Sequence, residues 1–221
     1  MYKYILMDLD NTLLDFNAGE LDAFNKVLES EDIAFTDDIM NQYKEMNTGL
    51  WADLELGKIS RKTLLDTRFQ LFFDSLSHHV DGIEKEKIFR ETLNNSHKLV
   101  EGAMDLLEYL KAKDVVICSA SNGVYHTQMQ RMQLSDIYQY FDYHFISEKI
   151  GYEKPDKRFF EHCLDVLNIK DKSEVLMIGD TPTSDILGAQ NIGIDSCYFG
   201  EKTTNATFNV KKLYEIKHII N

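Results

Sequence analysis

The stretch "MDLDNTLLDF", residues 7–16, places carboxylates at the end of an apolar segment. The residues at 4–7 form a short run of β-forming side chains, and Asp8, Asp10 and Thr12 follow at once. Similar apolar runs recur along the chain, at 115–118, 143–146, 175–178 and 194–199. Helical patterns such as residues 156–169 separate most of them. Strands that alternate with helices predict βαβ units, so we expect an α/β fold with a Rossmann-like parallel sheet and helices on both faces.

The long segment between the first two expected strands does not alternate in this way. From residue 19 to residue 98 the pattern is helical throughout. Ser60, followed three residues later by Thr63 and an apolar run, predicts a helix N-terminus. We therefore expect a catalytic core made of residues 1–15 and 99–221. An all-helical cap subdomain, residues 16–98, would be inserted after the first strand.

Composition limits the classes of partner. The 221 residues are 43% hydrophobic and 28% charged, which is typical of a globular protein. A formal net charge of -13 disfavours nucleic-acid polymers and anionic membrane surfaces, although local cations can still receive a small anionic substrate. The sequence shows neither a signal peptide nor an apolar run of about 18 residues, so we expect a cytoplasmic protein. Three widely spaced cysteines without a CxxC pair indicate no disulfide framework and no zinc site.

Polar residues follow each of the first four expected strands. In an open parallel sheet, ligands bind at the carboxyl ends of the strands. Taken alone, each polar stretch is typical of a turn or a helix start. Their recurrence at consecutive strand ends indicates a functional site, and the stretches are DLDNT (8–12), SASNG (119–123), KP (154–155) and GDTPTSD (179–185).

The acidic residues of these stretches predict a hard metal ion. An EF-hand is excluded because Leu13 stands where the calcium loop requires glycine and Gly19 where it requires glutamate. Carboxylates that converge on one place repel one another unless a cation is present. Ligands that are all oxygen favour Mg²⁺. The carboxylates expected to converge are Asp8, Asp10, Asp180 and Asp185.

This arrangement suits phosphoryl transfer, which needs positioning and charge neutralisation around the moving group. Asp8 would be the nucleophile and form an aspartyl-phosphate. Asp10 would protonate the leaving oxygen and then deprotonate water. Ser121 and Lys154 would bind the phosphoryl oxygens, and Lys154 would also hold Asp8 by charge.

The order DLDNT, SNG, KP, GDTPTSD resembles the four motifs of the haloacid dehalogenase superfamily, and the helical insertion resembles its cap. This resemblance implies that Mg²⁺ is bound by Asp8, by the backbone carbonyl of Asp10 and by Asp180. Asp185 would act through metal-bound water, and Thr12 would support the loop that carries Asp8 and Asp10.

The second motif leaves one assignment open, because either Ser119 or Ser121 fits it. We prefer Ser121, since Asn122 and Gly123 follow it as in related phosphatases. Asn11 and Asn122 are further candidates for phosphate binding.

The match is narrower within the superfamily. The segments NTGLWADLELGKIS (47–60), ISEKIGYEKPDKRFF (146–160) and VLMIGDTPTSDILGAQNIGI (175–194) are similar to those of bacterial pyrimidine 5'-nucleotidases. That similarity implies a small phosphorylated substrate, a nucleoside monophosphate such as dUMP, dTMP or UMP. Candidates for contact with its base or ribose are Phe16, Leu50, Trp51, Arg68 and Phe69. Phe69 and Phe72 are also at the helical spacing that is typical of a cap core.

Alternative functions remain. Another small phosphate ester, such as phosphoglycolate or a sugar phosphate, would suit the same chemistry. A carbon-halogen hydrolase would need Asp8 but neither Asp10 nor Mg²⁺. A phospho-receiver module would carry its acid pair on strand one and its acceptor on a later strand, and it would have no large inserted cap.

Overall fold

The computed structural model describes residues 1–220 and divides the chain into two compact units. Unit 1 contains Met1–Phe16 and the chain from His97 onward, and unit 2 contains Asn17–Ser96. The boundaries expected from the sequence were after residues 15 and 98.

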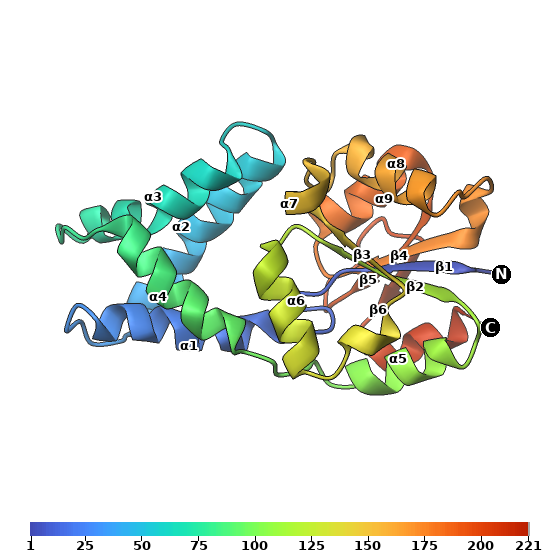
Figure 1. Ribbon diagram of the computed structural model, residues 1–221, viewed down its shortest axis with the longest axis horizontal. Coiled ribbons are helices and arrows are strands. Elements are labelled where there is room, and N and C mark those ends of the chain that lie inside the picture. The colour runs from blue at the N-terminus through green and yellow to red at the C-terminus, as the bar shows by residue number, and fades with distance from the viewer. Residues whose placement is uncertain (221) are drawn as a thin grey trace. The chain divides into compact units, whose positions relative to one another are not determined.

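Unit 1 is built on a parallel sheet. Among the described residues the strand order is β3-β2-β1-β4-β5-β6, and every neighbouring pair is parallel (Figure 1). This order confirms the predicted Rossmann-like α/β fold. The strands are β1 (Tyr4–Met7), β2 (Val116–Ser121), β3 (Tyr143–Ile146), β4 (Val175–Gly179), β5 (Asp195–Phe199) and β6 (Phe208–Val210).

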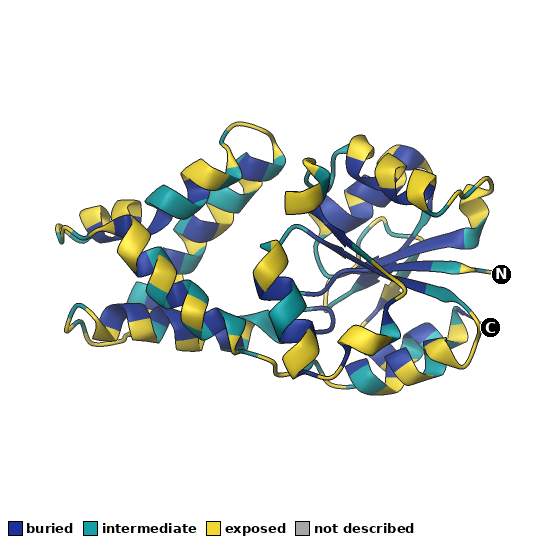
Figure 2. Ribbon diagram, viewed as in Figure 1, coloured by how far each residue is buried: buried dark blue, intermediate teal, exposed yellow. Residues whose placement is uncertain are grey.

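The side chains of β1 alternate between two apolar layers. Ile5 and Met7 pack into a cluster with Leu106 on one face of the sheet, whereas Leu6 packs with Phe159 on the other face. Accordingly, α8 and α9 cover one face in Figure 1 and α5 covers the other, and Figure 2 shows the strands largely buried between them. Because both faces are covered, the strand ends are the accessible part of the sheet.

The helical elements of unit 1 connect these strands. No helix in the described part of the chain is both long and apolar enough to cross a lipid bilayer. The helices are α5 (Ala103–Lys111), α6 (Tyr125–Leu134), α7 (Ser147–Ile150), α8 (Lys157–Val166) and α9 (Leu187–Ile192). Shorter turns are η1 (Tyr138–Tyr140), η2 (Lys172–Glu174), the π-helical η3 (Pro182–Ile186) and η4 (Leu213–His218).

Unit 2 is helical, as its sequence pattern predicts. Its elements are α1 (Phe16–Glu29, which begins in unit 1), α2 (Asp37–Glu55), α3 (Arg61–Ser75) and α4 (Gly82–Asn94). The Ser60 side chain accepts a hydrogen bond of 3.0 Å from the Thr63 N–H, which confirms the predicted start of α3. Buried aromatic rings fill the core, from Phe24, Tyr43, Phe69, Phe72, Phe73 and Phe89. The helical spacing of Phe69 and Phe72 therefore reflects core packing.

Arg68 also lies in the core of unit 2, with 1% of its surface exposed. Its Nε donates to Glu86 at 2.7 Å, and its Nη1 donates to the Asn47 side chain at 3.2 Å. The guanidinium carbon lies 4.9 Å and 4.4 Å from the ring centroids of Phe69 and Phe89. Arg68 is thus held by partners within its own unit, which gives this candidate substrate contact a structural role.

Arg68→Ala is expected to lower the free energy of unfolding by roughly 3 kcal/mol or more, because it breaks a buried ion pair and opens a cavity beside two rings. Urea denaturation followed by circular dichroism measures this change.

Lys62→Ala is the matched control, since Lys62 also lies on α3 and also pairs with a carboxylate, Asp66. The Lys62 side chain is 83% exposed, so its loss should change stability by about 1 kcal/mol or less. Equal effects of the two substitutions would contradict the structural role of Arg68.

Candidate active site

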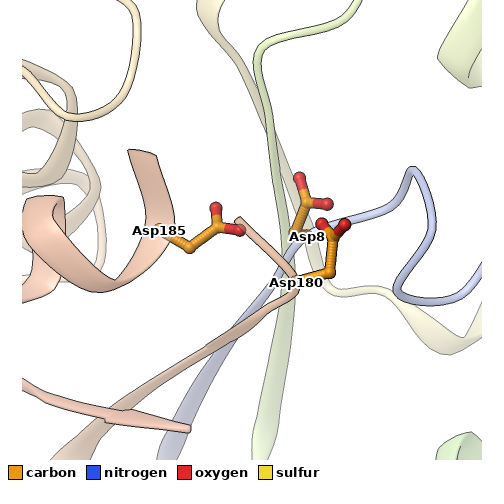
Figure 3. Close-up of side chains that lie close together, drawn as sticks. All are labelled: Asp8, Asp180 and Asp185. Atoms are coloured by element: carbon orange, nitrogen blue, oxygen red, sulfur yellow. The ribbon is translucent and has the colours of Figure 1, made fainter. Parts of the chain in front are cut away.

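The candidate site lies where three neighbouring strands end. Asp8 follows β1, Ser121 is the last residue of β2, and Asp180 follows β4. Because β1 lies between β2 and β4 and all three are parallel, these side chains leave the sheet at the same edge. Figure 3 shows Asp8 and Asp180 close to Asp185 of η3, and one oxygen from each carboxylate lies within 4.8 Å of the others.

Lys154 is a buried cation of this site. Its ammonium donates hydrogen bonds to Asp8 Oδ1 at 2.8 Å, to Asp185 Oδ1 at 2.6 Å and to the Ala120 carbonyl at 2.6 Å. These bonds use all three N–H donors of a lysine. Burial alone would lower the pKa of Lys154, but the charges of Asp185 and Asp8 raise it above its usual value. Lys154 is therefore a permanent positive charge between two carboxylates.

The Asn122 side chain fixes the backbone of Lys154. Its amide nitrogen donates to the Lys154 carbonyl at 2.8 Å, and its amide oxygen accepts from the Lys154 N–H at 2.8 Å. The Lys154–Pro155 peptide bond is cis. Asn122 was a candidate for phosphate binding, and the structure shows that both ends of its amide already contact Lys154.

Burial and mutual repulsion affect the acidic residues. Burial raises the pKa of Asp8 well above its usual value; Asp185 and Asp180 raise it further, and Lys154 opposes them. Burial and the charge of Asp185 likewise raise the pKa of Asp180 to about 7. The positive charge of Lys154 therefore does not balance all of the negative charge of these carboxylates. A bound cation would reduce the repulsion that remains.

Asp185 is fully buried and both of its oxygens accept hydrogen bonds. Oδ1 accepts from Lys154, and Oδ2 accepts from the Thr181 N–H at 3.0 Å. Gly179 makes room for this carboxylate, because a Cβ at position 179 would lie 2.2 Å from Asp185 Oδ2. The glycine at the end of β4 is therefore a steric requirement of the site.

The loop after β1 carries the remaining residues of the first motif. Thr12 Oγ1 donates to Asp8 Oδ2 over a long distance of 3.4 Å. Asn11 has a φ of +59°, a conformation that asparagine tolerates better than most residues, and its N–H donates to the Leu14 carbonyl at 2.7 Å. These bonds turn the chain tightly, so that Asp10 stays near Asp8.

The two serines of the second motif have different neighbours. Ser121 Oγ accepts from the Gly123 N–H at 3.0 Å and from the Gln128 amide at 2.8 Å. Ser119 Oγ instead lies 3.1 Å from His144 Nδ1. The geometry therefore favours Ser121 as the hydroxyl of the site.

Sequence reasoning missed two residues of α6. Gln128 Nε2 donates to Asp10 Oδ2 at 2.7 Å and also contacts Ser121, and Arg131 Nη1 donates to Asp10 Oδ1. Both lie in the helix that follows the second motif, three positions apart, which is the spacing of neighbours on one helix face. That spacing indicates a shared helix face, but it does not show which way the face points.

Two aromatic side chains that are candidates for substrate binding, Phe16 and Trp51, each lie against an arginine. The Arg131 guanidinium carbon lies 5.7 Å from the centroid of the Phe16 ring in unit 1. In unit 2, the Arg61 guanidinium carbon lies 5.6 Å from the Trp51 ring. Substrate roles for Phe16, Leu50 and Trp51 stay predictions.

Known proteins resemble this chain over almost its whole length. The model of a hydrolase family, haloacid dehalogenase-like hydrolase, matches residues 2–193. YfnB of Bacillus subtilis, described as a HAD-hydrolase, is 35% identical over 100% of this chain and 96% of its own. A crystal structure of YfnB bound to magnesium has a TM-score of 0.96 at 34% identity and covers 99% of this chain and 98% of that one.

Two relatives carry the name pyrimidine 5'-nucleotidase. PynA of Streptococcus pneumoniae is 36% identical over 97% of this chain and 91% of its own length. YjjG of Escherichia coli is 28% identical over 99% of this chain and 98% of its own length.

The raised pKa of Asp180 predicts a pH dependence of stability in metal-free protein. The pKa is about 7 in the folded state against a usual value of 3.8, so the folded state binds more protons between these values. The free energy of unfolding should therefore fall as pH rises from about 4 to about 7, by on the order of 4 kcal/mol for this group.

Asp180→Asn should remove this part of the slope, and urea denaturation in EDTA between pH 4 and pH 8 measures it. Asp165→Asn changes an exposed acid of α8 and should keep the wild-type slope. An unchanged slope in Asp180→Asn would show that Asp180 titrates normally in the folded protein.

Proposed function

Since the chain belongs to the haloacid dehalogenase-like hydrolase family, we propose that it is a Mg²⁺-dependent phosphomonoesterase that works through an aspartyl-phosphate. The observation that carries the proposal is the buried Lys154, which joins Asp8 to Asp185 beside Asp180. Such a cluster can bring a carboxylate and a phosphate dianion together, because positive charge offsets their repulsion.

Asp8 is the proposed nucleophile. Lys154 holds Asp8 Oδ1, and Oδ2, which accepts the long hydrogen bond from Thr12, attacks the phosphorus atom. The bond between phosphorus and the leaving oxygen breaks as the bond to Asp8 forms. Water then attacks the aspartyl-phosphate, which releases inorganic phosphate and restores the Asp8 carboxylate.

Asp10 is the proposed acid and base. It gives a proton to the leaving oxygen in the first step and takes one from the attacking water in the second. Its side chain is 27% exposed, in contrast to the buried Asp185, so a substrate can reach it. A carbon-halogen hydrolase has no use for this second acid, which favours phosphate chemistry over that alternative.

Ser121 and Lys154 are the proposed phosphate ligands. Ser121 Oγ already accepts two hydrogen bonds, so its own O–H can donate to a phosphoryl oxygen. Lys154 contributes its charge, and one of its three donors would change partner when a phosphate binds. Asn11 and Asn122 would support phosphate binding indirectly, through the backbone near the proposed ligands.

The donor set fits Mg²⁺, since the clustered acids offer only oxygen. Asp8, Asp180 and the backbone carbonyl of Asp10 would hold the ion. Asp185 would act through water, because Lys154 and Thr181 already bind its two oxygens. When bound, Mg²⁺ would supply charge neutralisation for the carboxylates and the transferred phosphoryl group.

The proposed substrate is a nucleoside monophosphate with a pyrimidine base. The support comes from PynA and YjjG, which are named pyrimidine 5'-nucleotidases. Phe16 and Trp51 are the aromatic side chains that we propose to contact the base or the ribose, since aromatic rings stack on planar bases. Other small phosphate esters would suit the same chemistry.

Phosphate release from nucleoside monophosphates should disappear in Asp8→Asn, because an amide cannot replace the carboxylate nucleophile. Asp10→Asn should lower kcat/KM by roughly 10²–10⁴-fold, since only the proton transfer is lost. Removal of metal with EDTA should abolish activity and added Mg²⁺ should restore it. Asp165→Asn is the control and should keep wild-type rates. Full activity of Asp8→Asn would refute the mechanism.

A screen of phosphate release should rank UMP, dUMP and dTMP above purine monophosphates, sugar phosphates and phosphoglycolate at equal concentration. The readout is kcat/KM for each ester with Mg²⁺ present. A clear preference for a sugar phosphate or phosphoglycolate would overturn the substrate but leave the roles of Asp8 and Asp10 intact.

A further inference from the structure

Two buried side chains of α6 hold the Asp10 carboxylate. Gln128 donates to Oδ2 at 2.7 Å and Arg131 donates to Oδ1, so that each oxygen has one donor. Gln128 and Arg131 are at most 1% exposed, whereas the Asp10 side chain is 27% exposed. The proposed mechanism assigns no role to either residue of α6.

The contacts leave Asp10 able to carry a proton. Each carboxylate oxygen has two lone-pair positions, and one donor on each oxygen occupies only half of them. The donors come from the buried side, and the exposed part of the carboxylate stays accessible to a leaving oxygen or a water. The Asp10 carboxylate is therefore held in one orientation, and a leaving oxygen or a water can still reach it.

Gln128 also links Asp10 to the proposed phosphate ligand. The same Nε2 that contacts Asp10 lies 2.8 Å from Ser121 Oγ. The amide oxygen of Gln128 accepts a long hydrogen bond of 3.4 Å from Arg131 Nη1. The glycine at position 123 leaves room for this amide, because a Cβ there would lie 2.4 Å from Gln128 Nε2.

Arg131 supplies the positive charge that holds the Asp10 carboxylate near Asp8 and Asp180. Asp10 is close enough to Asp8 and Asp180 for its charge to affect both of them. A carboxylate without a partner would turn away from two other carboxylates. The guanidinium pairs with Asp10 as Lys154 pairs with Asp8, and it is buried, so solvent screens the pair little.

We propose that Gln128 and Arg131 are positioning residues that fix Asp10 relative to Ser121, so that Asp10 meets the leaving oxygen while the phosphoryl group is bound. This inference rests on the proposed phosphatase function and extends it to α6. Neither residue touches the reacting atoms, since both act through Asp10.

The leaving group determines how strongly the first step depends on Asp10. A nucleoside leaves as an alkoxide and needs a proton, whereas p-nitrophenolate is stable without one. Since Asp10 also activates the water that attacks the aspartyl-phosphate, which both esters form, the two esters differ only in the first step. kcat/KM reports the steps up to release of the leaving group, so misplacement of Asp10 should lower kcat/KM for UMP much more than kcat/KM for p-nitrophenyl phosphate. A general loss of stability or of phosphate binding would slow both esters alike.

The variant Gln128→Met keeps the length of the side chain and removes its donors. We expect kcat/KM for UMP to fall roughly 10–100-fold, and kcat/KM for p-nitrophenyl phosphate to fall less than about 3-fold. The loss should be in kcat, with KM little changed. Gln133→Met, an exposed glutamine on the same helix, is the matched control and should keep wild-type rates on both esters.

Two further variants test the same contact. Gln128→Glu places an acceptor where Asp10 needs a donor, and Arg131→Lys keeps the charge but shortens its reach; each should show the same selective loss on UMP. In an Asp10→Asn background, Gln128→Met should add little further loss, because its effect passes through Asp10.

An equal loss of kcat/KM on the two esters, an unchanged kcat/KM for UMP, or a full additional loss in the Asp10→Asn background would overturn the inference. These outcomes are distinct from failure of the proposed function, in which the wild-type protein releases phosphate from neither ester.

Discussion

A single buried ammonium holds the active site together. Lys154 joins Asp8 after β1, the carbonyl of Ala120 in β2 and Asp185 in η3, which are segments far apart in the sequence. A buried cation is stable only when its donors are satisfied and its charge is balanced, and a buried carboxylate has the same need for a partner. The positions of the strand ends and of η3 thus depend on one another through this side chain.

Much of the fold could be predicted because apolar periodicity reports burial directly. β1 and β3 begin and end at the predicted residues, but β2 extends to Ser121, past the predicted end at residue 118. Small and polar residues have weak strand propensity, and pairing of Ser121 with Ile146 in β3 overrides it. β6 was missed because Phe208–Val210 becomes a strand only through its pairing with β5.

The site could be predicted where parallel topology brings motif residues to one edge, as with Asp8, Ser121 and Asp180. It could not be predicted where a side chain depends on the direction of a helix face. Gln128 resembles any polar residue of an amphipathic helix until α6 is seen to turn it toward Asp10. Arg68 shows the opposite case, because its place in the cap suggested a substrate contact, whereas the partners that bury it, such as Glu86, lie in another helix.

The central place of β1 has a consequence for the order of folding. Tyr4 pairs with Val116 on one side and with Val175 on the other, so neither partner exists when β1 leaves the ribosome. All of unit 2, whose aromatic core lies within Asn17–Ser96, is synthesised before β2. Contacts between distant residues form slowly, since the intervening chain must first close into a loop. We therefore expect the helical unit to form early in biosynthesis, and the catalytic edge of the sheet to be complete only after β4 has been made.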